Sequence, residues 1–187
     1  INIPPQYNNI TNIFKAELAK NTSVEMISLA NGSPFLENFM YLLEYEENGI
    51  KKQYTPTVFV GDENYTKTLG VNIIHGEDFS DNAESNKGKC IINQSLAKLF
   101  PNQNLIGEKL PGENNMTVIG ISNDFHYGSL ERYIEPGYIA YNNSGHYLLV
   151  RPASGKTTQV REIISSVWAK FITDYPLNIE TVGERYE

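Results

Sequence analysis

Residues 157–175, TTQVREIISSVWAKFITDY, carry the most regular hydrophobic pattern in the chain. Large apolar side chains follow Val160 at +3, +4, +7, +8, +11 and +12. Together with Val160 they are Ile163, Ile164, Val167, Trp168, Phe171 and Ile172. This period places them on one wide face of an α-helix. The pattern therefore predicts an amphipathic helix over 157–174 that ends before Pro176, because the residue before a proline disfavours helical backbone.

Two candidate strands flank this helix, HYLLVRP at 146–152 and LNIETVG at 177–183. The start of the chain has a similar order, with an amphipathic helix at 7–20 followed by a strand at 23–32. If residues 1–3, INI, are the end of a first strand, each end of the chain forms a strand–helix–strand unit. Two such units predict a ferredoxin-like split βαβ sheet with both helices on one face.

The middle of the chain is predicted to be mostly β. Two alternating apolar runs flank Asn48-Gly49, and Asn-Gly is the strongest short-range signal for a hairpin. A short helix is expected between Asp62, its N-cap candidate, and Gly70, and a second is expected after Asn93 as N-cap. The polar stretch 77–88 is predicted to be a loop.

These patterns together predict an α+β fold in two parts. Residues 1–33 plus 145–187 form a porter-like subdomain of the ferredoxin-like split βαβ type. Residues 34–144 form a mostly β subdomain inserted into it.

Bulk composition excludes several classes of function. The 187 residues carry a formal net charge of −7, so the surface offers no concentrated cationic footprint for nucleic acid. Cys90 is the single cysteine, which excludes an internal disulfide and is best interpreted as a small buried strand residue. No run approaches the roughly 18 apolar residues of a membrane span. The chain has neither an initial Met nor a signal peptide, so we expect it to be a piece of a longer protein.

The segment NDFHYGSL, 123–130, is the strongest candidate for chemistry, because Asp124 and His126 would point to the same face of an extended chain. Partners for them would be His75, Glu77, Asp78 and His146. No metal-binding helix motif, nucleophile elbow or phosphate loop accompanies them. We therefore interpret Asp124 as a cap for local backbone N–H groups at a strand end, in an Asx-type turn, and His126 as packing on the sheet. We predict no catalytic, cofactor-binding or metal site.

Several longer segments resemble a known family. In its order of motifs the chain resembles the extracytoplasmic domain of MacB/FtsX-type ABC transporter permeases, the MacB-like periplasmic core domain, and it is most similar to the version in Bacteroides-type bacteria. The matching segments span nearly the whole chain, and they are 64–79 (NYTKTLGVNIIHGEDF), 91–110 (IINQSLAKLFPNQNLIGEKL), 118–136 (VIGISNDFHYGSLERYIEP), 147–155 (YLLVRPASG) and 184–187 (ERYE). The chain departs from the family pattern at Glu77, where Arg is usual, at Gln94, where an acidic residue is usual, and at Gly183, where Asp is usual.

The resemblance implies a periplasmic domain of an inner-membrane protein, looped out between the first two membrane helices of a permease. Such a domain transmits ATP-driven conformational change across the membrane, to export or act on a periplasmic substrate or partner. It is not an enzyme and needs no cofactor. Implied partners are a cytoplasmic ABC ATPase subunit acting through the full permease, a second permease copy or domain, and a periplasmic protein, but not nucleic acid.

Two alternatives remain open at this point. One is a stand-alone extracytoplasmic module that binds a ligand or a protein, and the other is a small hydrolase that uses Asp124 and His126. A looped-out domain requires both chain ends to leave the same side of the body. We therefore expect residues 1–3 to lie beside the strand at 177–183, with the middle of the chain projecting the opposite way.

Overall fold

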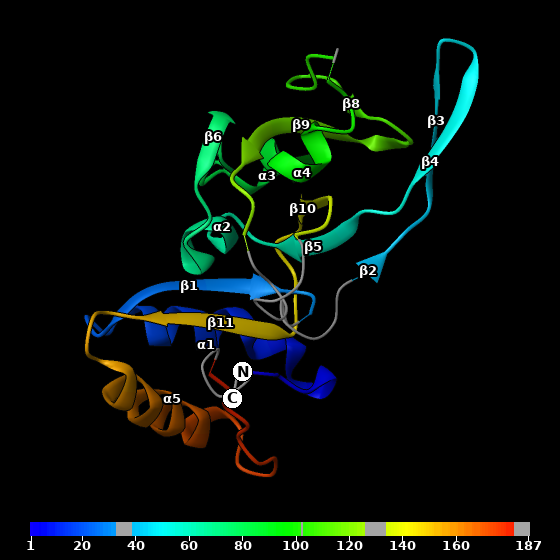
Figure 1. Ribbon diagram of the computed structural model, residues 1–187. Coiled ribbons are helices and arrows are strands. Elements are labelled where there is room, and N and C mark those ends of the chain that lie inside the picture. Colours follow the sequence, from blue (N-terminus) through cyan, green and yellow to red (C-terminus); the bar gives the residue numbers. More distant parts are fainter. Residues whose placement is uncertain (33–38, 102, 126–133, 182–187) are drawn as a thin grey trace.

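Figure 1 shows a computed structural model of the chain, which describes residues 1–32, 39–101, 103–125 and 134–181. The fold is α+β, with one large mixed sheet and few helices, as predicted. The helices are the 3-10 helix η1 (Pro5–Ile10) and the α-helices α1 (Thr11–Ala19), α2 (Tyr65–Leu69), α3 (Ala83–Asn86), α4 (Gln94–Ala97) and α5 (Thr157–Phe171). The strands are β1 (Val24–Ala30), β2 (Phe39–Met40), β3 (Leu43–Glu47), β4 (Ile50–Tyr54), β5 (Thr57–Gly61), β6 (Ile73–Gly76), β7 (Lys89–Asn93), β8 (Lys109–Leu110), β9 (Glu113–Ser122), β10 (Gly137–Tyr141) and β11 (Tyr147–Pro152).

The main sheet runs through most of the molecule in the order β11-β1-β5-β10-β7-β9-β6, with β2 paired to β5 and β8 to β9. The β10–β5 and β7–β9 pairs are parallel, and the remaining pairs are antiparallel. Strand β1 meets β5 at a single residue pair, Ala30 with Gly61. The β11–β1 end of the sheet is therefore joined to the rest by a narrow connection.

Helices α1 and α5 lie together on one face of β1 and β11 (Figure 1). Their apolar faces and the strands form the basal core, made of Ile3, Phe14, Leu18, Ile27, Leu29, Leu148, Val160, Ile164, Val167, Trp168 and Ile172. The Phe14 and Trp168 rings meet edge to face at 5.9 Å, a favoured aromatic geometry. The indole Nε1 of Trp168 donates a hydrogen bond to the carbonyl of Tyr175 at 2.9 Å, where the chain turns after the helix. The predicted helix is confirmed, although it ends at Phe171 and not at residue 174, and its apolar stripe packs on the basal core with Ile163 and Phe171 only partly buried.

The strand predicted at 177–183 is wrong over 177–181, which forms no regular structure. Leu177 and Ile179 instead pack against the basal core. The neighbouring edge of β11 is occupied by the start of the chain, since the Ile1 carbonyl accepts from Leu148 N at 2.9 Å. Alternating apolar residues bury one side of an extended segment whether or not it pairs in a sheet, so the pattern did not distinguish the two. Residues 1–3 accordingly lie beside β11, and residues 182 and 183 are outside the described residues.

The β3–β4 hairpin forms where Asn48-Gly49 predicted it. Both turn residues have positive φ, 53° and 77°, which is the requirement of a type I′ turn. The hairpin packs through its base, where the Tyr45 ring lies 4.9 Å from Phe100. Its two-stranded sheet extends away from the basal core (Figure 1).

Two details of the middle segment differ from expectation. The stretch 77–88 contains the short helix α3, whose N-cap residue Asn82 accepts from the backbone N–H of Glu84 at 3.1 Å. Four residues are too few to show a helical period. The N-cap of α2 is Asn64 and not Asp62, although Gly70 ends that helix in the left-handed conformation as predicted.

Buried apolar side chains form two further cores. The distal core is Leu43, Val58, Cys90, Ile92, Leu96, Phe100, Leu105, Leu110, Val118, Tyr138 and Ala140. The central core, which lies where the two ends of the sheet join, is Ala30, Phe59, Tyr65, Phe79, Ile91, Ile139 and Tyr141. The basal core draws on 1–33 and 145–187 alone and the distal core on 34–144 alone, a distribution that supports the two-subdomain division as a proposal.

Candidate functional site

Asp124 follows β9 and binds the start of helix α4. Its carboxylate accepts from Ser95 N at 2.8 Å and from Ser95 Oγ at 2.9 Å, and Lys98 Nζ lies 3.9 Å away. The side chain therefore satisfies a free backbone N–H in the first turn of a helix. The prediction of a local cap is therefore wrong, because the N–H group that Asp124 caps belongs to Ser95, which is distant in the sequence. His126, its predicted neighbour, is outside the described residues.

The other candidates for a chemical site are dispersed. His75 and Glu77 are exposed at β6, whereas Asp78 accepts from Thr66 Oγ1 at 2.8 Å and so ties the following loop to α2. His146 lies near the basal core, with its ring 4.8 Å from that of Tyr147. Within the described ranges, no group of three or more His, Cys, Asp or Glu side chains is placed to hold a metal ion.

A buried charge connects the two ends of the sheet. Asp62, directly after β5, is 1% exposed, and its carboxylate accepts from the backbone N–H of Leu29 at 2.8 Å. The same carboxylate oxygen forms an ion pair with Lys15 of α1, and Glu63 adds a carboxylate oxygen 3.7 Å from the ammonium. Because a buried carboxylate must be paired, Asp62 binds these partners with one oxygen. Its other oxygen accepts from the backbone N–H of Asn64, the N-cap residue of α2, at 3.1 Å.

A second connection lies at the C-terminal end of α2. Arg151 of β11 donates from Nη1 to the carbonyl of Lys67 at 2.8 Å, which also accepts from the backbone N–H of the C-cap residue Gly70 at 3.2 Å. Its guanidinium also lies over Gly70, where an added Cβ would come within 3.2 Å of Nη2. Polar contacts from α1 and β11 thus reinforce the narrow β1–β5 join.

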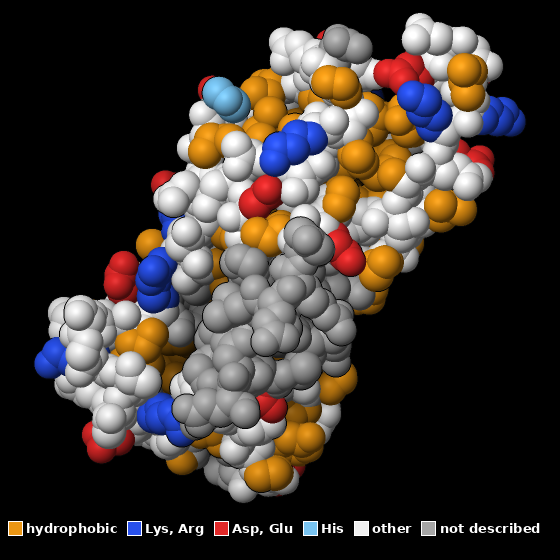
Figure 2. Space-filling view, in the orientation of Figure 1, with side chains coloured by type: hydrophobic (Ala, Val, Ile, Leu, Met, Phe, Trp, Pro, Cys, Tyr) orange, Lys and Arg blue, Asp and Glu red, His pale blue; other side chains and the backbone are white. Residues whose placement is uncertain are grey.

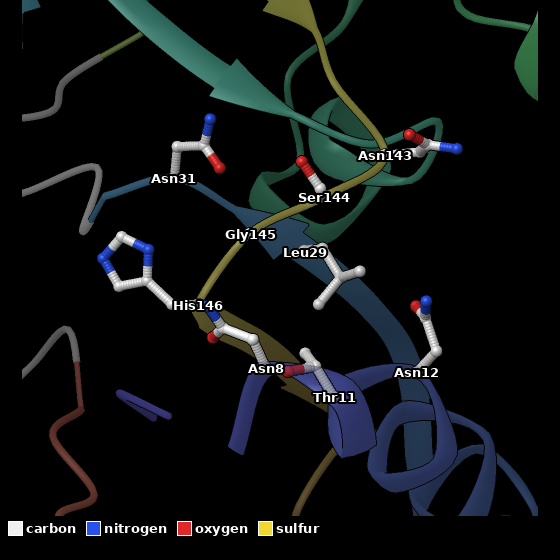
Figure 3. Close-up of a pocket in the computed structure, with 9 residues that line it drawn as sticks. All are labelled: Asn8, Thr11, Asn12, Leu29, Asn31, Asn143, Ser144, Gly145 and His146. Carbon is white, nitrogen blue, oxygen red and sulfur yellow. The ribbon is translucent and has the colours of Figure 1, made fainter. Parts of the chain in front are cut away.

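A cavity of about 220 Å³ opens beside this join (Figure 3). Asn8, Thr11 and Asn12 line it from η1 and α1, Leu29 and Asn31 from the end of β1, and residues 143–146 from the loop that leads into β11. Figure 3 shows these side chains around one opening between three parts of the chain. The described residues that line it include four side-chain amides and two hydroxyls but no Lys, Arg, Asp or Glu.

The wall formed by 143–146 is held in place by its backbone. Asn142 N donates to the Gly61 carbonyl at 2.8 Å, and the Asn142 side chain accepts from Ser144 N at 2.9 Å. Gly145 approaches β1 so closely that an added Cβ would lie 2.3 Å from the Ala30 carbonyl oxygen. The His146 carbonyl then accepts from Ile3 N at 2.6 Å. The loop is therefore fixed at both ends and in its middle.

Thr11 is the most unusual residue of the cavity. It is 3% exposed, and its Oγ1 has no hydrogen-bond partner in the part of the chain that the structure describes. A buried hydroxyl without a partner is uncommon and calls for an explanation. No motif marks this site in the sequence, because its residues are ordinary Asn, Thr and Ser from three distant segments.

Exposed apolar side chains occur at β2, beside β5, and at the tip of the β3–β4 hairpin. Figure 2 shows hydrophobic groups over the upper part of one face, towards the β3–β4 hairpin. The largest exposed ones near β2 and the hairpin tip are Phe39, Met40, Tyr41, Leu42 and Ile50, at 44–62% exposure. An apolar run of this kind is typical of an interaction surface.

The comparisons with known proteins point to one family. The sequence matches the family described as "MacB-like periplasmic core domain" over residues 3–167. No curated protein matches it significantly. Among the described residues no helix is both long and apolar enough to cross a membrane.

Two solved structures have a similar fold. The periplasmic region of MacB from Actinobacillus actinomycetemcomitans is 12% identical, with a TM-score of 0.61 over 90% of this chain and 80% of that one. The extracellular domain of the noncanonic ABC-type transporter YknZ from Gram-positive bacteria is 13% identical, with a TM-score of 0.60 over 91% of each chain. At these identities the likeness concerns the fold.

Proposed function

Because the chain belongs to the MacB-like periplasmic core domain family, we propose that it is the periplasmic domain of an ABC transporter permease. In this role it transmits ATP-driven conformational change from the inner membrane to a periplasmic substrate or partner. The family match over 3–167 is the observation that carries the proposal. The likeness to Bacteroides-type permeases stays a prediction.

The position of the chain ends supports a domain inserted between two membrane helices. Residues 1–3 pair with β11, and Leu177 and Ile179 pack on the same basal core. Both described ends therefore lie at the basal end of the molecule, and the β3–β4 hairpin extends away from it (Figure 1). This arrangement would place the basal core next to the membrane and the tip of the β3–β4 hairpin far from it.

The shared sheet supports transmission of motion. A hydrogen-bonded sheet runs from β11 to β6, so displacement of α1 and α5 would be carried to the distal core. The ion pair of Lys15 with Asp62 and the contact of Arg151 with α2 reinforce the narrowest point of that path. The domain would thus move largely as one body, with the join as its most deformable part.

The proposed partners follow from the same role. An ABC ATPase subunit in the cytoplasm would act on the domain through the full permease, and a second permease copy or domain would stand beside it. A periplasmic protein would meet the exposed apolar residues near β2. In this proposal ATP is hydrolysed elsewhere, and the domain itself catalyses no reaction.

The test uses the full permease with its ATPase in lipid nanodiscs. A spin label on the Lys51→Cys variant in a Cys90→Ala background reports the distance between the hairpins of two permease copies. We expect the distance distribution to differ between the ATP-free and the vanadate-trapped states. A label at Lys20→Cys, beside the basal core, is the control for motion close to the membrane. Identical hairpin distributions in both states, with ATP hydrolysis intact, would contradict the proposal.

A stand-alone ligand-binding module is the second candidate, and the cavity beside α1 favours it. The coding sequence on either side of the domain separates the two. The permease proposal requires an apolar span of about 20 residues just outside each end. A gene that encodes no such span on either side would favour the stand-alone module.

A further inference from the structure

We propose that the cavity between α1, the end of β1 and loop 143–146 binds a small neutral molecule rich in hydroxyl groups, of the size of one sugar ring. The proposal concerns this chain's own residues and does not depend on a role in transport. Its first support is the chemistry of the walls, which offer amides and hydroxyls from three separate segments.

Side-chain amides suit a hydroxyl-rich ligand. Each carboxamide presents a donor and an acceptor side by side, and each hydroxyl can act as either. Adjacent hydroxyls of a sugar ring match such pairs. The described lining residues include no Lys, Arg, Asp or Glu, so none of those side chains offers a counter-charge for a phosphate, a carboxylate or an ammonium group, and the His146 imidazole adds a further hydrogen-bonding group to the wall.

Thr11 supplies the second, independent observation. Its buried Oγ1 is left without a partner by the described residues, although a buried hydroxyl without one is destabilising. A ligand hydroxyl in the cavity would satisfy it. Thr68 has the same unpartnered Oγ1 but lies in α2 and does not line the cavity, so it serves as a matched control.

The walls are preorganised for binding. Gly145 is held against the Ala30 carbonyl, and the carbonyl of His146 accepts from Ile3 N. Because this loop is already ordered by the chain, a ligand would not need to order it.

Size favours a single ring over an extended peptide. A volume of about 220 Å³ has room for roughly seven water molecules at ~30 Å³ each. A ligand there would contact α1, β1 and the loop into β11 together. It would therefore brace the narrow β1–β5 join from one side.

Titration of the ¹⁵N-labelled chain followed by NMR tests the site. The probes are methyl α-D-glucopyranoside and N-acetyl-D-glucosamine, with trialanine and inorganic phosphate as chemically different probes. We expect at least one sugar to shift the amide signals of Thr11, Asn31 and Ser144, with a dissociation constant of about a millimolar. Neither trialanine nor phosphate should shift them comparably.

Two variants sharpen the test. Thr11→Val keeps the shape and removes the hydroxyl, so sugar binding should weaken about three- to tenfold, the effect of one neutral hydrogen bond. Asn143→Ala changes an exposed side chain of the cavity and should weaken binding similarly without affecting folding. Thr68→Val should bind as the parent chain does.

Several results would overturn the proposal. Absence of localised shifts with either sugar at about 100 mM, some hundredfold above the expected constant, would do so. Equal or stronger shifts with trialanine or phosphate would assign the cavity to another ligand class. Equal losses in Thr11→Val and Thr68→Val would show that the effect does not come from the cavity.

Discussion

Asp62 illustrates how a single residue can join two parts of a fold. Its buried carboxylate binds the Leu29 N–H of β1, the Lys15 ammonium of α1 and the Asn64 N–H at the start of α2. Leu29 is buried, so its N–H would be left without an acceptor if the carboxylate were removed. The residue therefore matters for stability although it lies in no site of chemistry.

Replacing Asp62 should show this directly. We expect Asp62→Ala to lower the free energy of unfolding by about 2–4 kcal/mol, because it leaves the buried Leu29 N–H without its acceptor and the Lys15 ammonium with Glu63 as its remaining carboxylate partner. Asp62→Asn keeps an acceptor for Leu29 N and should lose about half as much. Urea unfolding measures both. The Lys20→Met variant, which breaks an exposed pair with Glu17, is the control and should change stability by less than about 1 kcal/mol.

Cys90 makes a prediction about pH. Burial raises the pKa of its thiol to about 12, from an ordinary value of 9.0. Burial likewise raises the pKa of the Tyr65 hydroxyl above its ordinary value. Since the unfolded chain loses these protons first, the stabilisation is complete below about pH 9 and is lost as pH rises towards 12.

Stability should therefore fall above about pH 9 through Cys90, by up to about 1.4 kcal/mol per pH unit, and Tyr65 should add to the fall above its ordinary pKa of 10.0. Cys90→Ala should make this fall shallower, as measured by urea unfolding at pH 8, 9 and 10. Ellman's reagent at pH 8 should react with the thiol only after unfolding. Rapid reaction of the folded chain would contradict the buried placement.

The helices differ in how strongly their own residues predict them. Helix α5 has 15 residues and a full apolar stripe, so its period alone predicted it. Helices α3 and α4 have four residues each and depend on the caps Asn82 and Asn93. Of these caps only Asn93 was predicted, because it directly follows a strongly apolar strand.

The loop into β11 makes an element-scale prediction. We expect Gly145→Ala to destabilise the chain by more than about 2 kcal/mol, since the new Cβ would lie 2.3 Å from a backbone oxygen that cannot move alone. Gly107→Ala is the matched control. That glycine has a φ of +88°, and none of the described residues places an atom within 4 Å of an added Cβ, so the change should cost only about 1 kcal/mol of backbone preference. Equal losses in thermal unfolding would contradict the close approach.

For the whole molecule, the separate cores raise the question of how far the two parts unfold independently. The basal and distal cores share no residue, and the β1–β5 pairing that connects them is one residue long. The central core and the Lys15–Asp62 pair act against separation. The balance of these contacts decides whether the proposed subdomains are also units of unfolding.

We expect native-state hydrogen exchange to divide the amides into two groups. Amides of α1, β1, β11 and α5 should open together, and those of β7, β9 and β10 should open at a different free energy. Asp62→Ala should widen the difference by weakening the join. A single opening free energy for all core amides would contradict the two-subdomain proposal.

The sequence by itself determined the α+β class, the amphipathic helix α5, the hairpin turn at Asn48-Gly49 and the Asn93 cap. Each depends on residues within about one helix or one turn, where spacing and backbone preference act directly. The family resemblance likewise came from motifs read in order along the chain. For the helix, the turn and the cap, the interactions that decide the structure lie within the segment itself.

Tertiary structure alone decided the role of Asp62, the irregular course of 177–181 and the cavity beside Thr11. Asp62 serves partners in α1 and β1 because β1 lies next to β5 in the sheet. The cavity unites residues 8–12, 29–31 and 143–146, which come together only when β11 pairs with β1. The spacing of residues within one segment does not show which distant segments it will contact, because packing across the whole chain decides which strands pair.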